Sequence, residues 1–148
     1  MAIKRIIIKG TPLRDEDIAV AAITPGYLVE QVAAGVQKHS GAGLTAQPSF
    51  AVEREMTGDG IAVAYATSDT CLLAHCRNGD VVYALLAASA AAVVRGDFME
   101  SAGDGTVRKL GTDSSTPDTK RHGVVAVAME AVDNSSGSSE ARIIVRAV

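Results

Sequence analysis

The sequence predicts a mainly β chain that folds as a sandwich or a barrel, preceded by an extended N-terminal arm. About nine or ten short β-prone stretches follow one another with turn signals roughly every 8–12 residues, a spacing typical of these two architectures. The apolar residues are mostly small or β-branched, with 25 Ala and 17 Val against only 3% aromatic residues. We therefore expect residues 1–25 to form the arm and residues 26–148 to form a single β domain.

The composition argues against several classes of partner. A net charge of −3 provides no basic footprint for nucleic acid, and 3% aromatic residues are too few for a base-stacking surface. The longest near-continuous apolar run, residues 81–94, is shorter than the roughly 20 residues that span a bilayer. The N-terminal isoleucines are also too short a stretch for a secretory signal. We expect neither a nucleic-acid partner nor a membrane partner.

The two cysteines are expected to be free, buried thiols. Cys71, His75 and Cys76 lie in one β-prone stretch, where five residues separate the two cysteine Cα atoms by roughly 16 Å. An intrachain disulfide needs a separation below about 7 Å. A metal site would need further ligands, and His39 and His122 have no suitable spacing. The sequence therefore predicts no metal, no cofactor and assembly in a reducing compartment.

Within the arm, residues 3–9 are expected to form a short strand that Gly10 and Pro12 interrupt. The charged run that follows is typical of a solvated segment, and residues 15–22 favour one or two helical turns. Pro25 and Gly26 fit the centre of a type II turn, because Pro presets φ and Gly supplies a positive φ.

Strand and turn signals then alternate through the first half of the domain. Asn78 and Gly79 are the pair that favours a two-residue hairpin turn between flanking strands. Residues 35–47 are small and polar and predict a loop. The strands expected in this half are residues 27–32, 49–56, 61–65, 71–75 and 81–88.

The Ala-rich stretch over residues 84–93 has two interpretations. Its composition has a strong helix preference, whereas its flanks are strands and turns. Periodicity does not separate a buried helix from buried strands here. We favour two strands with a bend near Ser89 and keep a helix as the alternative.

The last third of the chain again alternates strands with turns. Gly103-Asp104-Gly105 is typical of a tight turn, and two polar stretches, residues 111–122 and 133–139, predict exposed loops. The final strand alternates, with Ile143 on one face and Arg142 and Arg146 on the other. The strands expected in this part are residues 98–100, 106–110, 124–132 and 141–148.

No motif for catalysis stands out. The Gly-Asp-Gly turn lacks the Gly-Lys pair of a phosphate loop, and there is no Gly-x-Ser-x-Gly nucleophile elbow. Glu53 and Glu55 are expected to share a strand face, which favours a solvated surface over a paired-carboxylate site. No His pairs with an acid at short spacing. The sequence therefore predicts no catalytic residues and a protein that is not an enzyme.

Five ordered segments resemble the cement, or head-decoration, proteins of tailed bacteriophages. They are GYLVE (26–30), SFAVERE (49–55), GDVVYALLA (79–87), ESAGDGT (100–106) and AMEAVDN (128–134). The similarity covers most of the chain from Gly26 onward and depends on the ordered set, since no single motif is diagnostic.

The resemblance implies a jelly-roll-like β domain on the outer capsid surface of a virion, assembled in the host cytoplasm. Such proteins bind as dimers or trimers, clamp neighbouring major capsid subunits and stabilise the shell without catalysis. Which residues touch the capsid varies in this family, so none is transferred by motif.

From the residues themselves, we expect the arm to add a strand to a neighbouring chain and the arginines to pair with capsid carboxylates. The expected capsid or subunit contacts are Ile3, Arg5, Ile6, Ile7, Ile8, Arg14, Arg142, Ile144 and Arg146. One alternative is a carbohydrate- or ligand-binding β-sandwich module. A more remote one is a trimeric hydrolase that would use acids such as Asp97 and Asp104 at subunit junctions.

Overall fold

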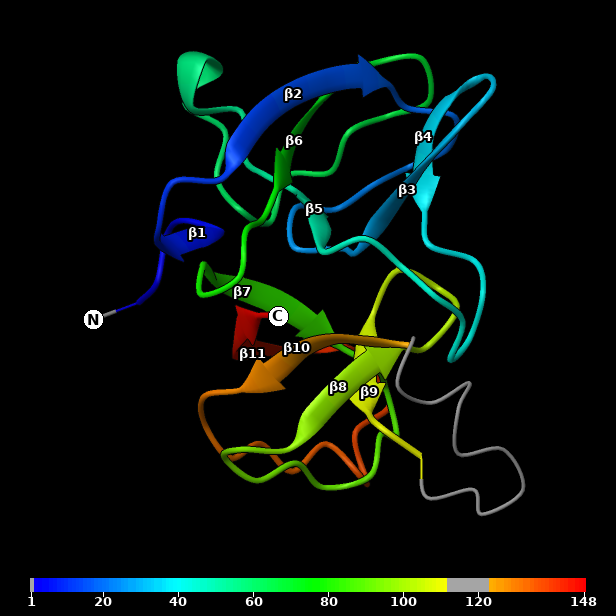
Figure 1. The fold of residues 1–148 in the computed structure, drawn as a ribbon. Helices are drawn as coiled ribbons and strands as arrows, with labels where there is room; N and C mark the ends of the chain where they lie inside the picture. Colours follow the sequence, from blue (N-terminus) through cyan, green and yellow to red (C-terminus); the bar gives the residue numbers. More distant parts are fainter. Residues whose placement is uncertain (1, 112–122) are drawn as a thin grey trace.

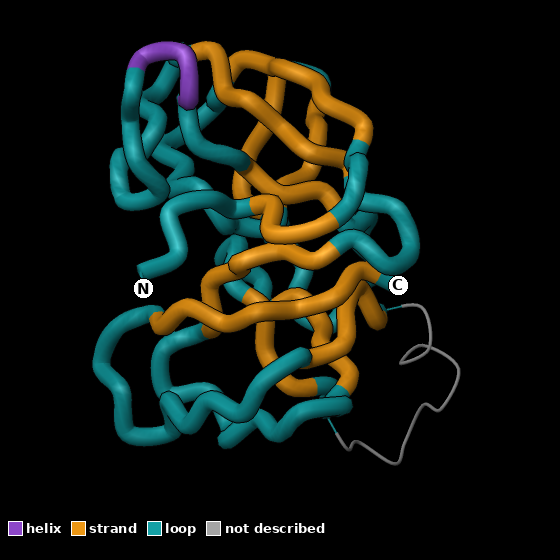
Figure 2. The backbone as a smooth tube through the Cα atoms, turned by 90° about the vertical axis from the view of Figure 1, so that its left-hand side faces the viewer, coloured by secondary structure: helices purple, strands orange, loops and turns teal. Residues whose placement is uncertain are grey.

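A computed structural model describes residues 2–111 and 123–148, which form two stacked layers of β structure (Figures 1 and 2). The lower layer in Figure 1 is a barrel, and the upper layer holds two small sheets. The prediction of a mainly β barrel or sandwich is confirmed. The expected loop at 111–122 lies almost entirely outside the described residues. In the part of the chain that is described, no helix is long and apolar enough to cross a membrane.

Five strands close the barrel. They follow the order β7-β11-β10-β8-β9, and β9 returns to pair with β7 through Leu86 and Val107 in parallel. β1 adds to β7 as a sixth strand, beyond the closed ring. The bounds are β1 (Ile7–Lys9), β7 (Val81–Leu86), β8 (Phe98–Ser101), β9 (Val107–Lys109), β10 (Val124–Ala128) and β11 (Ala141–Ala147).

The upper layer contains a three-stranded sheet, ordered β2-β6-β5, and a separate β3–β4 hairpin. A 3-10 turn, η1 (Glu55–Thr57), projects from the top of this layer (Figure 2). The strand bounds are β2 (Leu13–Ile18), β3 (Val29–Val32), β4 (Gly35–Lys38), β5 (Ser49–Ala51) and β6 (Thr70–His75).

The larger of two core clusters joins the layers. It comes mainly from the barrel strands, where Met99 and Ile143 are fully buried, and it continues into Leu28 and Phe50. Many of its members are Ala or Val, and such small side chains suit the interior of a barrel with only five strands. The last strand alternates as predicted, because Ile143, Val145 and Ala147 are buried while Arg146 is exposed.

The N-terminal 25 residues are extended, but they are not an arm outside the core. Ile6 is fully buried in the larger cluster, and Ala19 and Ile23 are buried in the smaller one. β1 pairs with β7, and β2 pairs with β6 of the same chain. The helical turns expected over residues 15–22 are wrong, because the open edge of β6 recruits this segment as a strand and tertiary pairing overrides a weak helix propensity.

The Asn78-Gly79 turn does not make a hairpin. Gly79 has the expected positive φ of 100°, and Asp80 N donates to Arg77 O over 3.0 Å. However, β6 already pairs with β2 on one edge and with β5 on the other. Strand β7 pairs with β11 on one edge and with β1 and β9 on the other. With both edges of each strand occupied, the turn instead passes the chain from the upper layer to the barrel.

A predicted loop and a predicted strand also need correction. Residues 35–47 contain β4, whose hairpin turns at Ala33-Ala34, a pair with no turn signature. Residues 61–65 form no strand, and only Tyr65 makes a bridge, to Ile23.

The Ala-rich stretch is a strand as far as Leu86 and is not a helix. Beyond the end of this strand, Ser89 takes a positive φ of 54° at the predicted bend. The expected second strand is reduced to one bridge between Val93 and Val132.

Candidate functional site

The N-terminal segment is fastened to both layers. Ile6 O accepts a hydrogen bond from Tyr83 N at 2.8 Å, and Ile6 N donates to Glu53 Oε2 at 3.1 Å. Farther along, Thr11 N donates to the buried Asp80 carboxylate at 3.2 Å. These bonds hold residues 6–11 in one path across the junction of the layers, where the N-terminal end is seen in Figure 2.

The outer side of this segment forms an open groove. Its walls enclose about 420 Å³ and consist of Ala2, Ile3, Lys4, Arg5, Ile7 and Ile8. Because β1 stands at the end of the strand order, one of its backbone edges has no strand partner among the described residues. The groove therefore combines half-buried isoleucines, two cations and an open strand edge.

Charge is unevenly distributed along the chain. Residues 1–14 contain Lys4, Arg5, Lys9 and Arg14 and no acid, whereas the remaining residues carry 10 cations and 17 acids. Within the described residues, the ion pair that this segment makes is a loose one of 3.6 Å between Arg5 and Glu55 on η1. The N-terminal segment is thus a basic strip on an acidic body.

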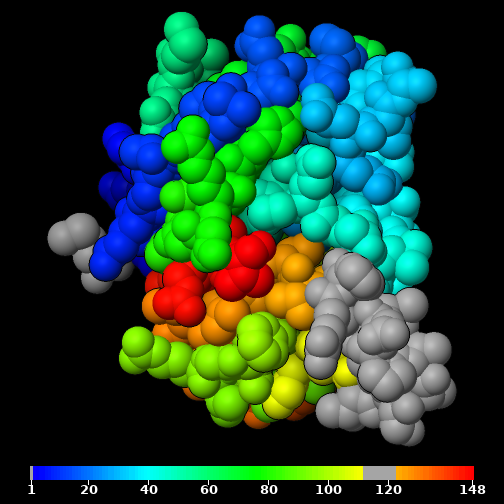
Figure 3. Space-filling model, in the orientation of Figure 1, coloured from blue at the N-terminus to red at the C-terminus, as the bar shows by residue number. Residues whose placement is uncertain are grey.

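Sheet register extends this strip across the barrel. Lys9 pairs with Val81, Val81 with Arg146, Arg146 with Val127, and Val127 with Phe98. Residues directly opposite one another in antiparallel strands share a face. Lys9, Arg146 and Phe98 are exposed, and the two valines are half-buried. We call these five residues the outer row. Figure 3 shows the red C-terminal residues on the surface, with green residues above them and orange residues below.

The structure separates the expected contact residues into two groups. Ile3, Ile7, Ile8 and Ile144 are partly exposed, and Arg5, Arg14 and Arg146 are exposed. Ile6 is fully buried, so it cannot contact a capsid directly. Arg142 is half-buried, and its guanidinium already donates within the chain, to Pro25 O at 2.8 Å and Ile61 O at 2.9 Å. Burial lowers the pKa of Arg142, whose role is to bind loop carbonyls.

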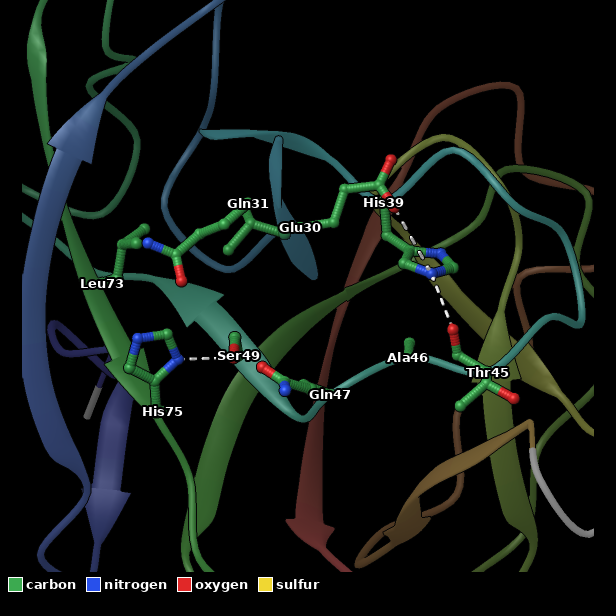
Figure 4. A pocket seen from close by; sticks show the side chains of 10 residues that line it. Glu30, Gln31, His39, Thr45, Ala46, Gln47, Ser49, Leu73 and His75 are labelled. Carbon is green, nitrogen blue, oxygen red and sulfur yellow. Dashed lines mark hydrogen bonds and ion pairs between the residues drawn. The ribbon is translucent and has the colours of Figure 1, made fainter. Parts of the chain in front are cut away.

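A second feature is a polar pocket of about 350 Å³ in the upper layer (Figure 4). Two histidines face it from opposite ends. His75 on β6 lies beside Ser49 and Leu73, and His39 lies beside Thr45 at the other end. Glu30, Gln31 and Gln47 complete most of its polar wall.

At one end of the pocket, Ser49, His75 and Asp15 form a hydrogen-bonded chain. Ser49 Oγ lies 2.7 Å from His75 Nδ1, and His75 Nε2 lies 3.1 Å from Asp15 Oδ2. The side-chain hydrogen bond with His75 is the main reason that the pKa of Asp15 is lowered. Ser49 is 4% exposed, yet it lines the pocket.

At the other end, His39 is more enclosed. Its Nδ1 lies 2.7 Å from Ser101 Oγ, and its Nε2 lies 3.3 Å from Thr45 O. Glu30 Oε2 is 3.8 Å away, beyond hydrogen-bond distance. Partial burial opposes ionisation of Glu30, but hydrogen bonds from Gln37 and Ser40 lower its pKa. This end is a buried structural network.

The acids singled out in the sequence do not form a shared site. Glu53 is buried and accepts from Ile6 N, whereas Glu55 is exposed on η1. Asp97 instead pairs with Lys109 at 3.0 Å, and Asp104 accepts from Thr106 N at 3.0 Å. Among the residues with described positions, no group of three or more His, Cys, Asp or Glu has the arrangement of a metal site.

Cys71 and Cys76 are both free thiols. Burial raises the pKa of each to about 12, so neither is a reactive thiolate near neutral pH.

Sequence reasoning missed the Ser49–His75–Asp15 chain because its members lie far apart along the polypeptide. The fold brings them together on β5, β6 and β2, three adjacent strands of one sheet. The local signal was His75, the single histidine in the β-prone stretch 71–75. It was weighed there only as a metal ligand, and that metal site was rejected. No family model matches this chain, and no curated protein matches it either.

Proposed function

We propose that this chain is a capsid cement protein that binds the outside of a phage head and clamps neighbouring major capsid subunits. The ordered resemblance described above supports the class of protein. The cement role requires binding and no chemistry, and it places the protein on the outer surface of the virion. As in that family, we propose that it acts as a dimer or trimer.

The outer row is the observation that carries this proposal. It combines two cations with three apolar side chains across five neighbouring strands, and it begins at the basic groove of the N-terminal segment. Apolar side chains contribute affinity when they are removed from water, at about 25 cal/mol per Å² of buried area. Cations around them favour a partner of opposite charge. The surface therefore fits an apolar patch flanked by carboxylates on the capsid protein.

The N-terminal segment offers a second mode of attachment. The open edge of β1 has the geometry for β-augmentation, in which an extended segment of a neighbouring chain adds as a further strand. Because β1 already pairs with β7, it acts as a template held in place by its own barrel. This differs from a free arm, which would lose conformational entropy on binding.

Co-sedimentation with emptied phage heads that lack the protein tests the proposal. We expect saturable binding at a fixed number of copies per head and a higher melting temperature of the heads. Replacing two exposed members of the outer row, with Arg146→Glu and Phe98→Ala, should weaken binding at least about tenfold. Arg95→Glu, an equal charge reversal outside the row, is the matched control. Equal binding of both variants would show that the row is not the contact.

The charge component has its own test. If cations steer and hold the complex, raising the salt concentration to about 0.5 M should weaken attachment, because the Debye length falls below about 5 Å. Binding that is indifferent to salt would place the affinity in the apolar residues alone.

A carbohydrate- or ligand-binding module remains the alternative function. The polar pocket favours it by size, but the residues described as lining it include no aromatic side chain on which a sugar ring stacks. Failure to bind intact heads, together with a positive glycan array, would favour this alternative over a cement role.

A further inference from the structure

We propose that Ser49 is the nucleophile of an acyl-transfer site that takes small carboxylic esters, with His75 as its general base and Asp15 as a positioning residue. This activity is independent of the cement role, because it uses the polar pocket of the upper layer and not the outer row. Three observations support it: the hydrogen-bonded chain, its direction and the pocket into which it opens.

The chain is built by strand register. Ser49 and His75 are directly opposite on β5 and β6, and Leu13 faces His75 from β2. Asp15 follows Leu13 by two residues, so it lies on the same face and reaches His75 diagonally. The distances, 2.7 Å for Ser49 Oγ to His75 Nδ1 and 3.1 Å for His75 Nε2 to Asp15 Oδ2, are those of hydrogen bonds.

The direction of the chain follows from the acceptor at its end. An ionised carboxylate only accepts hydrogen bonds, so the His75 Nε2 facing Asp15 carries the proton. In the neutral imidazole Nδ1 then holds a lone pair, and the Ser49 hydroxyl donates to it. This is the arrangement by which a base activates a serine and an acid holds the base in the required tautomer.

The pocket provides access and a complementary surface. Ser49, Gln47 and His75 line the same cavity of about 350 Å³, and Val29, Ala46 and Leu73 supply its apolar wall. This volume is near the lower limit of small-molecule sites, so the acyl group is a short one. Figure 4 shows the Gln47 side chain beside Ser49, where its amide can donate to the oxyanion of a tetrahedral intermediate.

The reaction balances with water as the only co-reactant. Ser49 Oγ attacks the ester carbonyl carbon, its proton passes to His75 Nδ1, and that proton leaves with the departing alcohol. The acyl group is then bound to Ser49 as an ester. Water attacks this ester while His75 accepts its proton, and the carboxylic acid departs as Ser49 regains a hydrogen from His75.

A further serine–histidine pair among the described residues shows why Ser49 is selected. Ser101 is fully buried, and its Oγ also accepts from Gly103 N at 3.1 Å. Its partner His39 is oriented by a backbone carbonyl instead of a carboxylate. Ser49 has both the carboxylate-oriented base and the adjoining cavity.

Covalent labelling of the purified chain, without capsids, tests the site. Diethyl p-nitrophenyl phosphate is the probe, because attack by a serine oxygen forms a stable diethylphosphoryl ester and releases p-nitrophenolate. We expect about one p-nitrophenolate per chain and a phosphoryl adduct mapped to Ser49 by peptide mass spectrometry. An adduct confined to other residues, or no adduct on the folded chain, would overturn the proposal.

Hydrolysis of p-nitrophenyl acetate gives the second measurement. Ser49→Ala and His75→Gln should lower kcat by about 100-fold or to the buffer rate. Asp15→Asn should lower kcat while leaving KM unchanged, as expected of a residue that only orients the base. Ser40→Ala is the matched control, because it removes an exposed hydroxyl that donates to the Glu30 carboxylate at 2.7 Å. Equal rates in Ser49→Ala and Ser40→Ala, with both variants folded by circular dichroism, would exclude Ser49 as the nucleophile.

Discussion

The backbone N–H of Ile6 donates to Oε2 of Glu53 over 3.1 Å, and both residues are buried, at 0% and 7% exposure. Ile6 directly precedes β1 at the edge of the barrel, and Glu53 follows β5 in the upper layer. The bond between them therefore helps to hold the two layers together. The position of the basic groove and of the first member of the outer row depends on it.

Removing this bond should destabilise the fold. Glu53→Ala leaves the Ile6 N–H without its carboxylate in a buried position, at a cost of about 1–3 kcal/mol. Urea unfolding followed by circular dichroism measures the loss. Glu55→Ala, two residues away and exposed, should change the free energy of unfolding by less than about 0.5 kcal/mol. Equal effects of the two substitutions would contradict the role assigned to Glu53.

Arg142 should be irreplaceable by lysine. Its planar guanidinium binds Pro25 O and Ile61 O at once, and its charge lies 5.6 Å from the centre of the Tyr83 ring. A lysine ammonium cannot reproduce this fork, so Arg142→Lys should cost about 1–3 kcal/mol by leaving carbonyls unpaired. The exposed Arg146→Lys serves as its control in thermal melting, and we expect its melting temperature to match that of the unmodified chain.

Asp17 should protect the open edge of β2. Its carboxylate accepts from the following Ile18 N at 2.8 Å, and Asp15 does the same for Glu16 N. Charged groups on an edge strand block pairing with another chain. Asp17→Ala should therefore increase self-association, measured by sedimentation velocity at rising protein concentration. Glu16→Ala removes a charge from the same strand without freeing an edge N–H; equal association of this variant would assign the effect to net charge.

Acid should weaken the attachment between β8 and β9. The Val94 N–H and the Lys109 ammonium lower the pKa of Asp97. Because this pKa is depressed in the folded state, Asp97 stabilises the protein above the ordinary aspartate pKa of about 4. That contribution is lost as the pH falls through the lowered value. Asp97→Asn should thus reduce the melting temperature at neutral pH and flatten its fall below about pH 4. If the melting temperatures of the Asp97→Asn variant and of the unmodified protein fell equally as the pH is lowered, this role of Asp97 would be contradicted.

The two thiols should be unreactive in the folded protein. Burial raises the pKa of Cys71 and Cys76 to about 12, so almost all of each is protonated at pH 8. Reaction with a disulfide reagent at this pH should be slow in buffer and fast in denaturant, where the pKa returns to about 8.5. A Cys76→Ser variant shows the behaviour of Cys71 alone. Rapid modification without unfolding would show that a thiol is accessible.

Local patterns in the sequence determined the fold class and several elements. Alternation identified the buried and exposed faces of the last strand, and Gly103 and Gly105 marked a turn that requires positive φ at both positions, 90° and 86°. Small and β-branched residues predicted a β core built largely from such side chains, although Phe50, Tyr65 and Met99 are also fully buried. These properties depend on neighbours within a few residues, so a single sequence expresses them directly.

Tertiary structure decided which strands pair, and with that the candidate sites. Asn78-Gly79 has hairpin chemistry, but the strands beside it were already paired on both edges. Residues 15–18 became part of a strand because β6 offered an open edge. Register alone brought Lys9 into line with Arg146 and placed Asp15 diagonally across from His75. Such long-range pairings follow from the combined free energy of the whole core, and no local stretch of sequence encodes them.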